Sequence, residues 1–275
     1  MESLFKQDPA FTIEVLSRFI KTEVEKYNFQ GGVIALSGGL DSAFVSILAH
    51  KALEGKIKLL YMPFENPEQA EADATSVAKL LNLPLERFDL KPVAEPFFTI
   101  RSPLSPLRKG NILARLRMTA LFDMSARDNT LVIGTSNKSE ILVGYSTWYG
   151  DSAAGIMPLG DLYKTQIRLL SPTLGVPDPI LKKAPSAELW EGQSDEMEIG
   201  LSYEKLDQIL FYYIDQRYTE MEIVKMGFSE IDIQKVIRLT KKALYKQRAA
   251  IICKLSDRTV GIDYRYVKDT AISEV

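Results

Sequence analysis

The chain has 275 residues with 34 basic and 36 acidic side chains, so its formal net charge is −2 when its one histidine is neutral. This balance lacks the basic excess that polyanion binding requires, so we expect no nucleic-acid partner. With 46% hydrophobic residues the chain can bury a core, which excludes disordered and fibrous classes. The length allows one large domain or two small ones.

Cysteine and histidine each occur once. Cys253 forms no intramolecular disulfide or cysteine cluster, so a reducing compartment fits, and we interpret it as a packed side chain near the end of an amphipathic helix. His50 ends the apolar run AFVSILAH and is more simply a structural or capping residue than a member of a catalytic triad. The N-terminus lacks a signal pattern and no apolar run is long enough to span a bilayer, so we expect a soluble cytoplasmic protein with no membrane partner.

Apolar and amphipathic stretches alternate through the first half of the chain. Asp8-Pro9 is a good start for a helix whose apolar residues recur at helical spacing to about Tyr27. In chain order the following runs predict strand 32–36, helix 41–54, strand 57–62, helix 67–82, strand 85–90, helix 110–128 and strand 130–135. Short apolar strands separated by helices are typical of a doubly wound parallel sheet, so the predicted fold class is α/β.

Beyond residue 136 the pattern changes to loops and helices. Helices are predicted near 161–171, 203–216 and 230–253. The stretch 182–200 is long and polar and has few periodic apolar positions, so it is the best candidate for a mobile lid. We expect one domain over 1–275, made of a core at about 30–175, a lid with C-terminal helices at about 176–255, and a tail at 256–275.

The strongest local motif is SGGLDS, Ser37–Ser42, which lies between a predicted strand and a predicted helix. Free backbone N–H groups and the helix dipole favour phosphate at such a turn. Gly38 and Gly39 allow a tight turn and a close approach to an anion, and the two serine hydroxyls can donate further bonds. Asp41 beside phosphate is tolerable mainly with a divalent cation between them. An ordinary glycine turn is the alternative interpretation.

The loop resembles that of the N-type ATP pyrophosphatases, in which SGGxDS holds the pyrophosphate of ATP during adenylation. Six further motifs occur in the order and spacing of the NAD⁺ synthetase family, and the resemblance covers about residues 10–255. They are NILARLRM (111–118), GTSNKSE (134–140), GYSTWYGD (144–151), PLGDLYKTQ (158–166), KAPSAELW (183–190) and QSDEMEIGLSYEKLD (193–207). The resemblance implies a Rossmann-like sheet with additional C-terminal helices.

The resemblance also implies a site for ATP and Mg²⁺. The implied ATP-binding residues are Ser37, Gly38, Gly39, Leu40, Asp41, Ser42, Thr135, Lys164 and Ser186. GTSNKSE follows a predicted strand and lies at the same sheet edge as SGGLDS, so Glu140 can join Asp41 at one metal. Mg²⁺ and Lys164 together would neutralise charge on the leaving pyrophosphate. A solvated helix carboxylate, a surface lysine and a turn serine are the plainer interpretations of Glu140, Lys164 and Ser186.

The second substrate that the resemblance implies is deamido-NAD⁺, with its nicotinate carboxylate as nucleophile. Asn111 and Arg115 lie at i and i+4 on one face of a predicted helix and suit the phosphates and sugars of a dinucleotide. Asp151 resembles a family residue near the nicotinate, and with Asp41 and Lys164 it completes the implied catalytic set; an isolated Tyr-Gly-Asp would more often be a turn. The other residues assigned to this substrate or to phosphates are Lys138, Tyr245 and Lys246.

The implied reaction is that of a ligase, in which ammonia displaces AMP from an acyl adenylate in the last step of NAD⁺ biosynthesis. Relatives with a fused glutaminase domain use a cysteine nucleophile, so here we expect free ammonia or a separate donor. The family works as a homodimer, and helix 110–128 is a candidate interface. Two positions depart from the family pattern: Gly155 replaces an acidic residue, and Tyr245-Lys246 replaces His-Lys.

Three alternatives remain. Adenylating enzymes that modify tRNA share the loop, but they would be expected to have a basic surface or, where they transfer sulfur, cysteines. GMP and argininosuccinate synthetases share the loop without the NKSE, YGD and PSA motifs. A non-catalytic adenine-nucleotide sensor would not need Glu140 and Lys164 beside Asp41.

Overall fold

The computed structural model describes residues 8–65, 68–185, 194–248 and 250–260. Its centre is a four-stranded sheet in the order β3-β2-β1-β4, in which every neighbouring pair is parallel. The strands are β1 Gly31–Ala35, β2 Ile57–Tyr61, β3 Leu85–Arg87 and β4 Thr130–Val132. The predicted α/β class with a parallel sheet is therefore confirmed.

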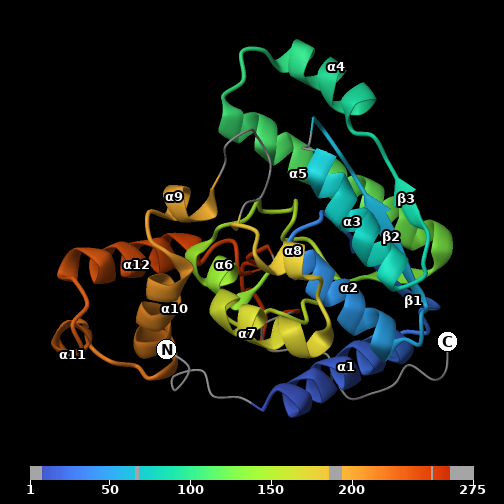
Figure 1. The fold of residues 1–275 in the computed structure, drawn as a ribbon. Coiled ribbons are helices and arrows are strands. Elements are labelled where there is room, and N and C mark those ends of the chain that lie inside the picture. Colours follow the sequence, from blue (N-terminus) through green and yellow to red (C-terminus); the bar gives the residue numbers. More distant parts are fainter. Residues whose placement is uncertain (1–7, 66–67, 186–193, 249, 261–275) are drawn as a thin grey trace.

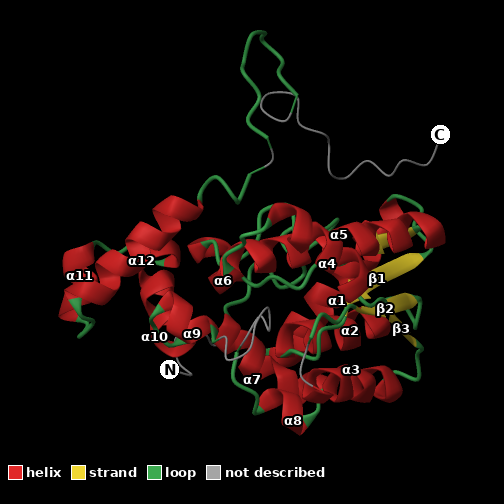
Figure 2. Ribbon diagram, turned by 90° about the horizontal axis from the view of Figure 1, so that it is seen from above, coloured by secondary structure: helices red, strands yellow, loops and turns green. Residues whose placement is uncertain are grey.

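Helices cover both faces of the sheet (Figures 1 and 2). On one side lie α1 Pro9–Lys26, α2 Leu40–Ala52, α3 Glu68–Leu80 and α7 Lys164–Leu174; on the other lie α4 Lys91–Arg101 and α5 Pro106–Asp128. Successive side chains of β1 serve opposite faces, because Val33 joins the core under α5 whereas Ile34 joins the core with α2. The chain reverses its winding between β1 and β4, and a crevice forms at the carboxyl ends of these strands.

Start and stop signals in the sequence explain the bounds of the long helices. The Phe11 N–H donates to Asp8 Oδ1 at 2.9 Å, and a proline takes the first position of α1. Ser105 starts α5 in the same way, again followed by proline. Asn129 ends α5 in a left-handed conformation with φ 48°, which asparagine tolerates better than most residues.

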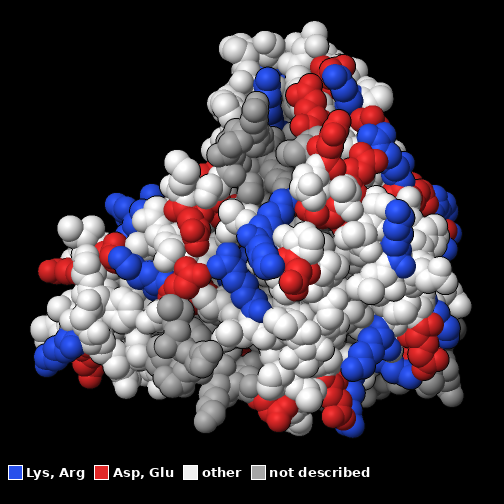
Figure 3. All heavy atoms as spheres, in the orientation of Figure 1, with Lys and Arg blue, Asp and Glu red and all other residues white. Residues whose placement is uncertain are grey.

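The second half of the chain adds a layer of helices beside the sheet, at the far end from β3 in Figure 2. They are α6 Lys138–Val143, α9 Asp195–Ile199, α10 Tyr203–Leu210, the π-helical η1 Phe211–Asp215, α11 Glu220–Lys225 and α12 Glu230–Ala243. The short helix α8 Asp178–Leu181 instead packs against α2. Tyr203, Leu206, Ile233 and Val236 form a second apolar core here. Basic and acidic side chains alternate over the face in Figure 3. In the ranges that the structure covers, no helix is both long and apolar enough to cross a membrane.

Two sequence expectations were wrong. The helix predicted over 230–253 ends at Ala243, and Cys253 is exposed rather than packed. The apolar residues of this stretch meet no core, since Ile251 is 85% exposed, and helices gain most of their stability from packing. The sequence interpretation also missed α4, because Pro96 lies inside it and proline disfavours helix interiors.

Candidate active site

One pocket opens at the carboxyl edge of the sheet, and most of the residues predicted to bind ATP line it. These are Ser37, Gly39, Leu40, Asp41, Ser42, Thr135 and Lys164, and the predicted metal ligand Glu140 lines it too. Asp151 lines it as well, and α5 closes one side through Ala114 and Arg117. The topology thus brings residues of β1, α2, α6, α7 and the segment after β4 to one cavity.

The Ser37–Ser42 turn is built by its own residues. Gly38 has φ 87°, and a Cβ atom there would lie 2.4 Å from the carbonyl oxygen of Ala70, so only glycine fits. The Gly39 N–H donates to Ser37 Oγ at 3.3 Å, and Ser42 Oγ donates to the Gly39 carbonyl at 3.0 Å. Gly39 caps α2 without a side chain, so the first N–H groups of α2 are available to an anion.

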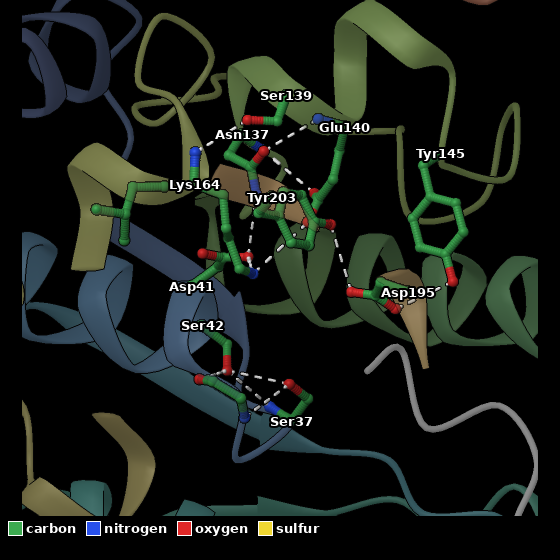
Figure 4. Close-up of polar contacts among 12 residues, drawn as sticks. Ser37, Asp41, Ser42, Asn137, Ser139, Glu140, Tyr145, Lys164, Asp195 and Tyr203 are labelled. Atoms are coloured by element: carbon green, nitrogen blue, oxygen red, sulfur yellow. Dashed lines mark hydrogen bonds and ion pairs between the residues drawn. The ribbon is translucent and has the colours of Figure 1, made fainter. Parts of the chain in front are cut away.

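A lysine and two carboxylates meet above this turn (Figure 4). Lys164 Nζ lies 2.5 Å from Asp41 Oδ2 and 3.7 Å from Glu140 Oε1. Asn137 Nδ2 donates to the same Asp41 oxygen at 3.2 Å. The other oxygen, Asp41 Oδ1, is buried and has no hydrogen-bond partner among the described residues. A buried acceptor of this kind is costly unless a ligand completes it.

The burial of this cluster changes its protonation. Burial, and then the neighbouring Asp41 carboxylate, raise the pKa of Glu140 to about 8. Burial alone would lower the pKa of Lys164, but the charges of Asp41 and Glu140 outweigh that effect and raise it. At neutral pH the lysine is therefore charged and Glu140 is mostly protonated, and an added cation would favour the ionised form of Glu140 beside Asp41.

The donor set fits Mg²⁺ better than a metal held by protein alone. Within the described part of the chain, no three His, Cys, Asp or Glu side chains are grouped as a metal site. Asp41 and Glu140 offer two carboxylates, and one of them has an unsatisfied oxygen. Mg²⁺ commonly binds through one or two carboxylates and takes its other ligands from water and phosphates.

Residues expected at the dinucleotide instead contact the loop before Asp151. Asn111 Oδ1 accepts a hydrogen bond from Thr147 Oγ1 at 2.9 Å, and Arg115 Nη2 donates to the Trp148 carbonyl at 3.2 Å. Asp151 Oδ1 accepts from the Thr147 N–H at 2.6 Å. The start of α5 therefore supports the turn that carries Asp151 into the pocket.

Tyr245 and Lys246 reach the same loop from beyond α12. The Tyr245 ring packs edge to face on Trp148, with centroids 5.3 Å apart. Lys246 Nζ donates to the carbonyls of Gly144 at 2.7 Å and Ser146 at 2.6 Å, so it caps the end of α6. Neither residue is among those that line the pocket.

Two other predicted residues lie elsewhere. Lys138 Nζ forms ion pairs with Asp161 and Asp215, both at 2.9 Å, and lies outside the pocket lining. Ser186 lies outside the described residues, as does the middle of the predicted lid. At the near end of that stretch Lys183 lines the pocket and pairs with Asp73 at 3.2 Å.

The departure at Gly155 has a packing reason. A Cβ atom at this position would lie 2.4 Å from Leu131 Cδ1 and 3.2 Å from the Val132 carbonyl oxygen. The Gly155 N–H also donates to that carbonyl at 2.9 Å. An acidic side chain here would require the Leu131 side chain to move and would crowd the Val132 carbonyl.

Sequence reasoning did not single out Tyr145 and Asp195, although both line the pocket. The Tyr145 hydroxyl lies 3.0 Å from Asp195 Oδ1 and 3.0 Å from Glu198 Oε2, and the Tyr203 hydroxyl lies 3.4 Å from Asp195 Oδ2. Asp195 is 4% exposed at the start of α9. Both residues lie inside motifs of the resemblance, which was the available signal.

Comparisons with known proteins agree with this geometry. The family model described as NAD synthase matches residues 12–250. The NH(3)-dependent NAD(+) synthetase of Chlorobaculum tepidum is 44% identical over 257 residues, which is 93% of each chain. An NMN synthetase from Francisella tularensis superposes with a TM-score of 0.81 at 32% identity, over 90% of this chain and 99% of that one. The NH3-dependent NAD synthetase of Campylobacter jejuni, solved with nitrate, gives a TM-score of 0.79 at 31% identity, over 90% and 100%.

Proposed function

The chain belongs to the NAD synthase family, and on that premise we propose that it is a ligase that amidates deamido-NAD⁺ with ammonia at the expense of ATP. The products are NAD⁺, AMP and pyrophosphate. One observation carries the assignment of the site: Asp41, Glu140 and Lys164, from three separate segments, meet beside the Ser37–Ser42 turn. A nucleotide sensor would not need this arrangement.

The chemistry proceeds in two steps. A nicotinate carboxylate oxygen attacks the α-phosphorus of ATP, which forms an acyl adenylate and releases pyrophosphate. Ammonia then attacks the acyl carbon and expels AMP. The turn and the N-terminus of α2 bind the pyrophosphate group, and the Lys164 ammonium offsets charge that develops on it. The pocket walls orient both anionic substrates and keep water from the adenylate.

Mg²⁺ would be held by Asp41 and Glu140, with further oxygens from the phosphates of ATP. Bound there, it would neutralise phosphate charge and lower the barrier to attack. Glu140 has a pKa raised to about 8, so cation binding would displace its proton. Thr135 and Ser186 complete the proposed ATP contacts.

The dinucleotide would lie along the loop that carries Asp151. Asp151 lines the pocket, whereas Asn111 and Arg115 hold the loop from α5. Their remaining donors, with Tyr245 and Lys246 beyond α12, form the proposed surface for sugars and phosphates. For Lys138 to contact a phosphate, its ammonium would have to leave its ion pairs with Asp161 and Asp215.

Labelled substrate tests the chemistry directly. With oxygen-18 in the nicotinate carboxylate, the released AMP should carry one label, because the attacking oxygen stays on phosphorus. Unlabelled AMP during turnover would rule out the acyl adenylate. The same assay with nicotinate mononucleotide tests the rival suggested by the NMN synthetase relative: turnover of that acceptor in preference to deamido-NAD⁺ would reassign the substrate.

We also propose a homodimer. Val93, Phe97 and Ile100 recur at i, i+4 and i+7, so they form one face of α4, and all three are exposed. Leu107 at the start of α5 is 64% exposed and continues this apolar surface. Light scattering should give twice the chain mass, and Ile100→Glu should give the monomer mass. A wild-type monomer at micromolar concentration would contradict the proposal.

A further inference from the structure

Asp207 on α10 is a fully buried acid outside the residues that line the pocket. Its carboxylate faces three donors. Ser139 Oγ donates to Oδ1 at 2.6 Å, while the Thr165 N–H and Thr165 Oγ1 donate to Oδ2 at 2.9 and 2.8 Å. Charge-assisted bonds of this length are strong, and together they join α10 to α6 and α7.

The partners of Asp207 are direct neighbours of the proposed site residues. Ser139 precedes Glu140, and Thr165 follows Lys164. Ser139 Oγ also accepts the Lys164 N–H at 2.9 Å (Figure 4). One carboxylate therefore fixes the start of α6 relative to the start of α7.

Helix α7 depends on this outside support because its own cap residue does not supply it. The hydroxyl of Tyr163, the residue before the helix, donates to Asp215 at 3.0 Å instead. The N–H groups of Lys164 and Thr165 are two of the donors that an α-helix cannot satisfy internally. Ser139 and Asp207 accept them, so the direction in which α7 presents Lys164 is set from α6 and α10.

The three donors favour a carboxylate over an amide. An amide at this position would have one acceptor oxygen, and its NH₂ group would face a donor. Burial raises the pKa of Asp207 to about 6, so the group remains ionised at neutral pH even though the ionised form is costly in this environment. A helix contact alone could be made more favourably by apolar side chains.

We propose that Asp207 is a positioning residue that holds α6 and α7 so that Glu140 and Lys164 meet Asp41. It touches neither substrate nor metal, and it acts through Ser139 and Thr165. Its kinetic test rests on the proposed function, whereas its structural test does not.

The variant Asp207→Asn keeps the size of the side chain and removes one acceptor. Asp232→Asn is the matched control. Asp232 lies on α12 and pairs at 3.0 Å with Lys205, which is on α10 like Asp207, so this ion pair joins α10 to α12 and not to α6 or α7. We expect Asp207→Asn to lower kcat about 10- to 100-fold, as misplacement of catalytic groups by about 1 Å does, with KM for deamido-NAD⁺ within about twofold. The control should stay within about twofold in both constants.

Ser139→Ala separates positioning from general loss of packing. If Asp207 acts through Ser139, the double variant should lose little more than Asp207→Asn alone. Fully additive losses, or an equal loss in Asp232→Asn, would overturn the proposal.

A crystal structure of Asp207→Asn gives a readout without activity. Lys164 Nζ should move out of contact with Asp41, which is 2.5 Å away in the wild type. An unchanged contact would overturn the proposal, even if the wild type failed to amidate any acceptor and the proposed function fell separately.

Discussion

Two parts of the pocket are built in different ways. One is the Ser37–Ser42 turn, and the other is the corner, in which Asn137, Glu140 and Lys164 meet Asp41. The hydrogen bonds that shape the turn join residues at most five positions apart, such as Ser37 and Ser42. The contacts of the corner span 96 positions from Asn137 to Asp41 and 123 from Lys164 to Asp41. The turn therefore depends on local backbone geometry, whereas the corner depends on the docking of whole helices.

Asp41 belongs to both the turn and the corner, so its substitution should have the largest effect. Asp41→Ala removes the proposed metal ligand and the partner of Lys164, and we expect product formation to fall at least about 10³-fold. The fold should persist, because α2 keeps its apolar core. Steady-state assay and circular dichroism check this together. A folded Asp41→Ala protein with wild-type rates would count against the site.

Lys164→Met tests the corner alone. The variant leaves Asp41 and Glu140 without their shared cation, and we expect kcat to fall about 10²- to 10³-fold. Thermal denaturation should show a loss of about 3 kcal/mol that Mg²⁺ partly restores, because the metal can replace the missing charge. If Mg²⁺ did not change this loss of stability, the result would contradict the proposal that Asp41 and Glu140 bind the metal.

Gly38→Ala against Gly39→Ala tests the turn alone. At Gly38 a Cβ atom meets the Ala70 carbonyl oxygen at 2.4 Å and φ is 87°, whereas at Gly39 the nearest contact is Ser37 Oγ at 3.4 Å. We expect Gly38→Ala to cost about 2 kcal/mol of unfolding free energy and most ATP binding, and Gly39→Ala to cost less than about 1 kcal/mol. Urea denaturation and ATP titration check both. Equal costs would show that the turn is not confined by Ala70.

The same contrast explains what the sequence could predict. The turn was predictable because its shape depends on neighbouring residues, and the strand before it followed from its short apolar run. In the corner, the position of Glu140 after a predicted strand placed it at the same sheet edge as Asp41. Lys164 was predictable only through the resemblance, since nothing near it indicates Asp41. Asp207 could not be predicted at all, because its partners lie 68 and 42 positions away. The end of α12 was misjudged because helical pattern does not reveal whether a surface exists to pack against.

The pH dependence of kcat should follow the ionisation of Asp207, because Asp207 positions Glu140 and Lys164. Its carboxylate has a pKa near 6 and must be ionised to accept three bonds, so below pH 6 the active fraction should fall about tenfold per pH unit. Glu204 on the same helix and Tyr163, the residue before α7, are its titratable neighbours, and the charge of Glu204 favours the protonated form of Asp207. Profiles of kcat should show this break in the wild type and not in Asp207→Asn. The same break in both proteins would assign it to another group.

The smallest effect should come from Lys138, which follows Asn137 but points away from the cluster. Its ammonium lies between Asp161 and Asp215 and 4.8 Å from the centre of the Tyr163 ring, so it fastens α6 to η1. Lys138→Met should lower stability by about 1 kcal/mol, as expected for a partly exposed pair, and change kcat by less than about threefold. Parallel melting curves and kinetics decide this. A tenfold rise in KM for deamido-NAD⁺ at unchanged stability would instead place Lys138 at the substrate, so that the corner would bind phosphate as well as position Lys164.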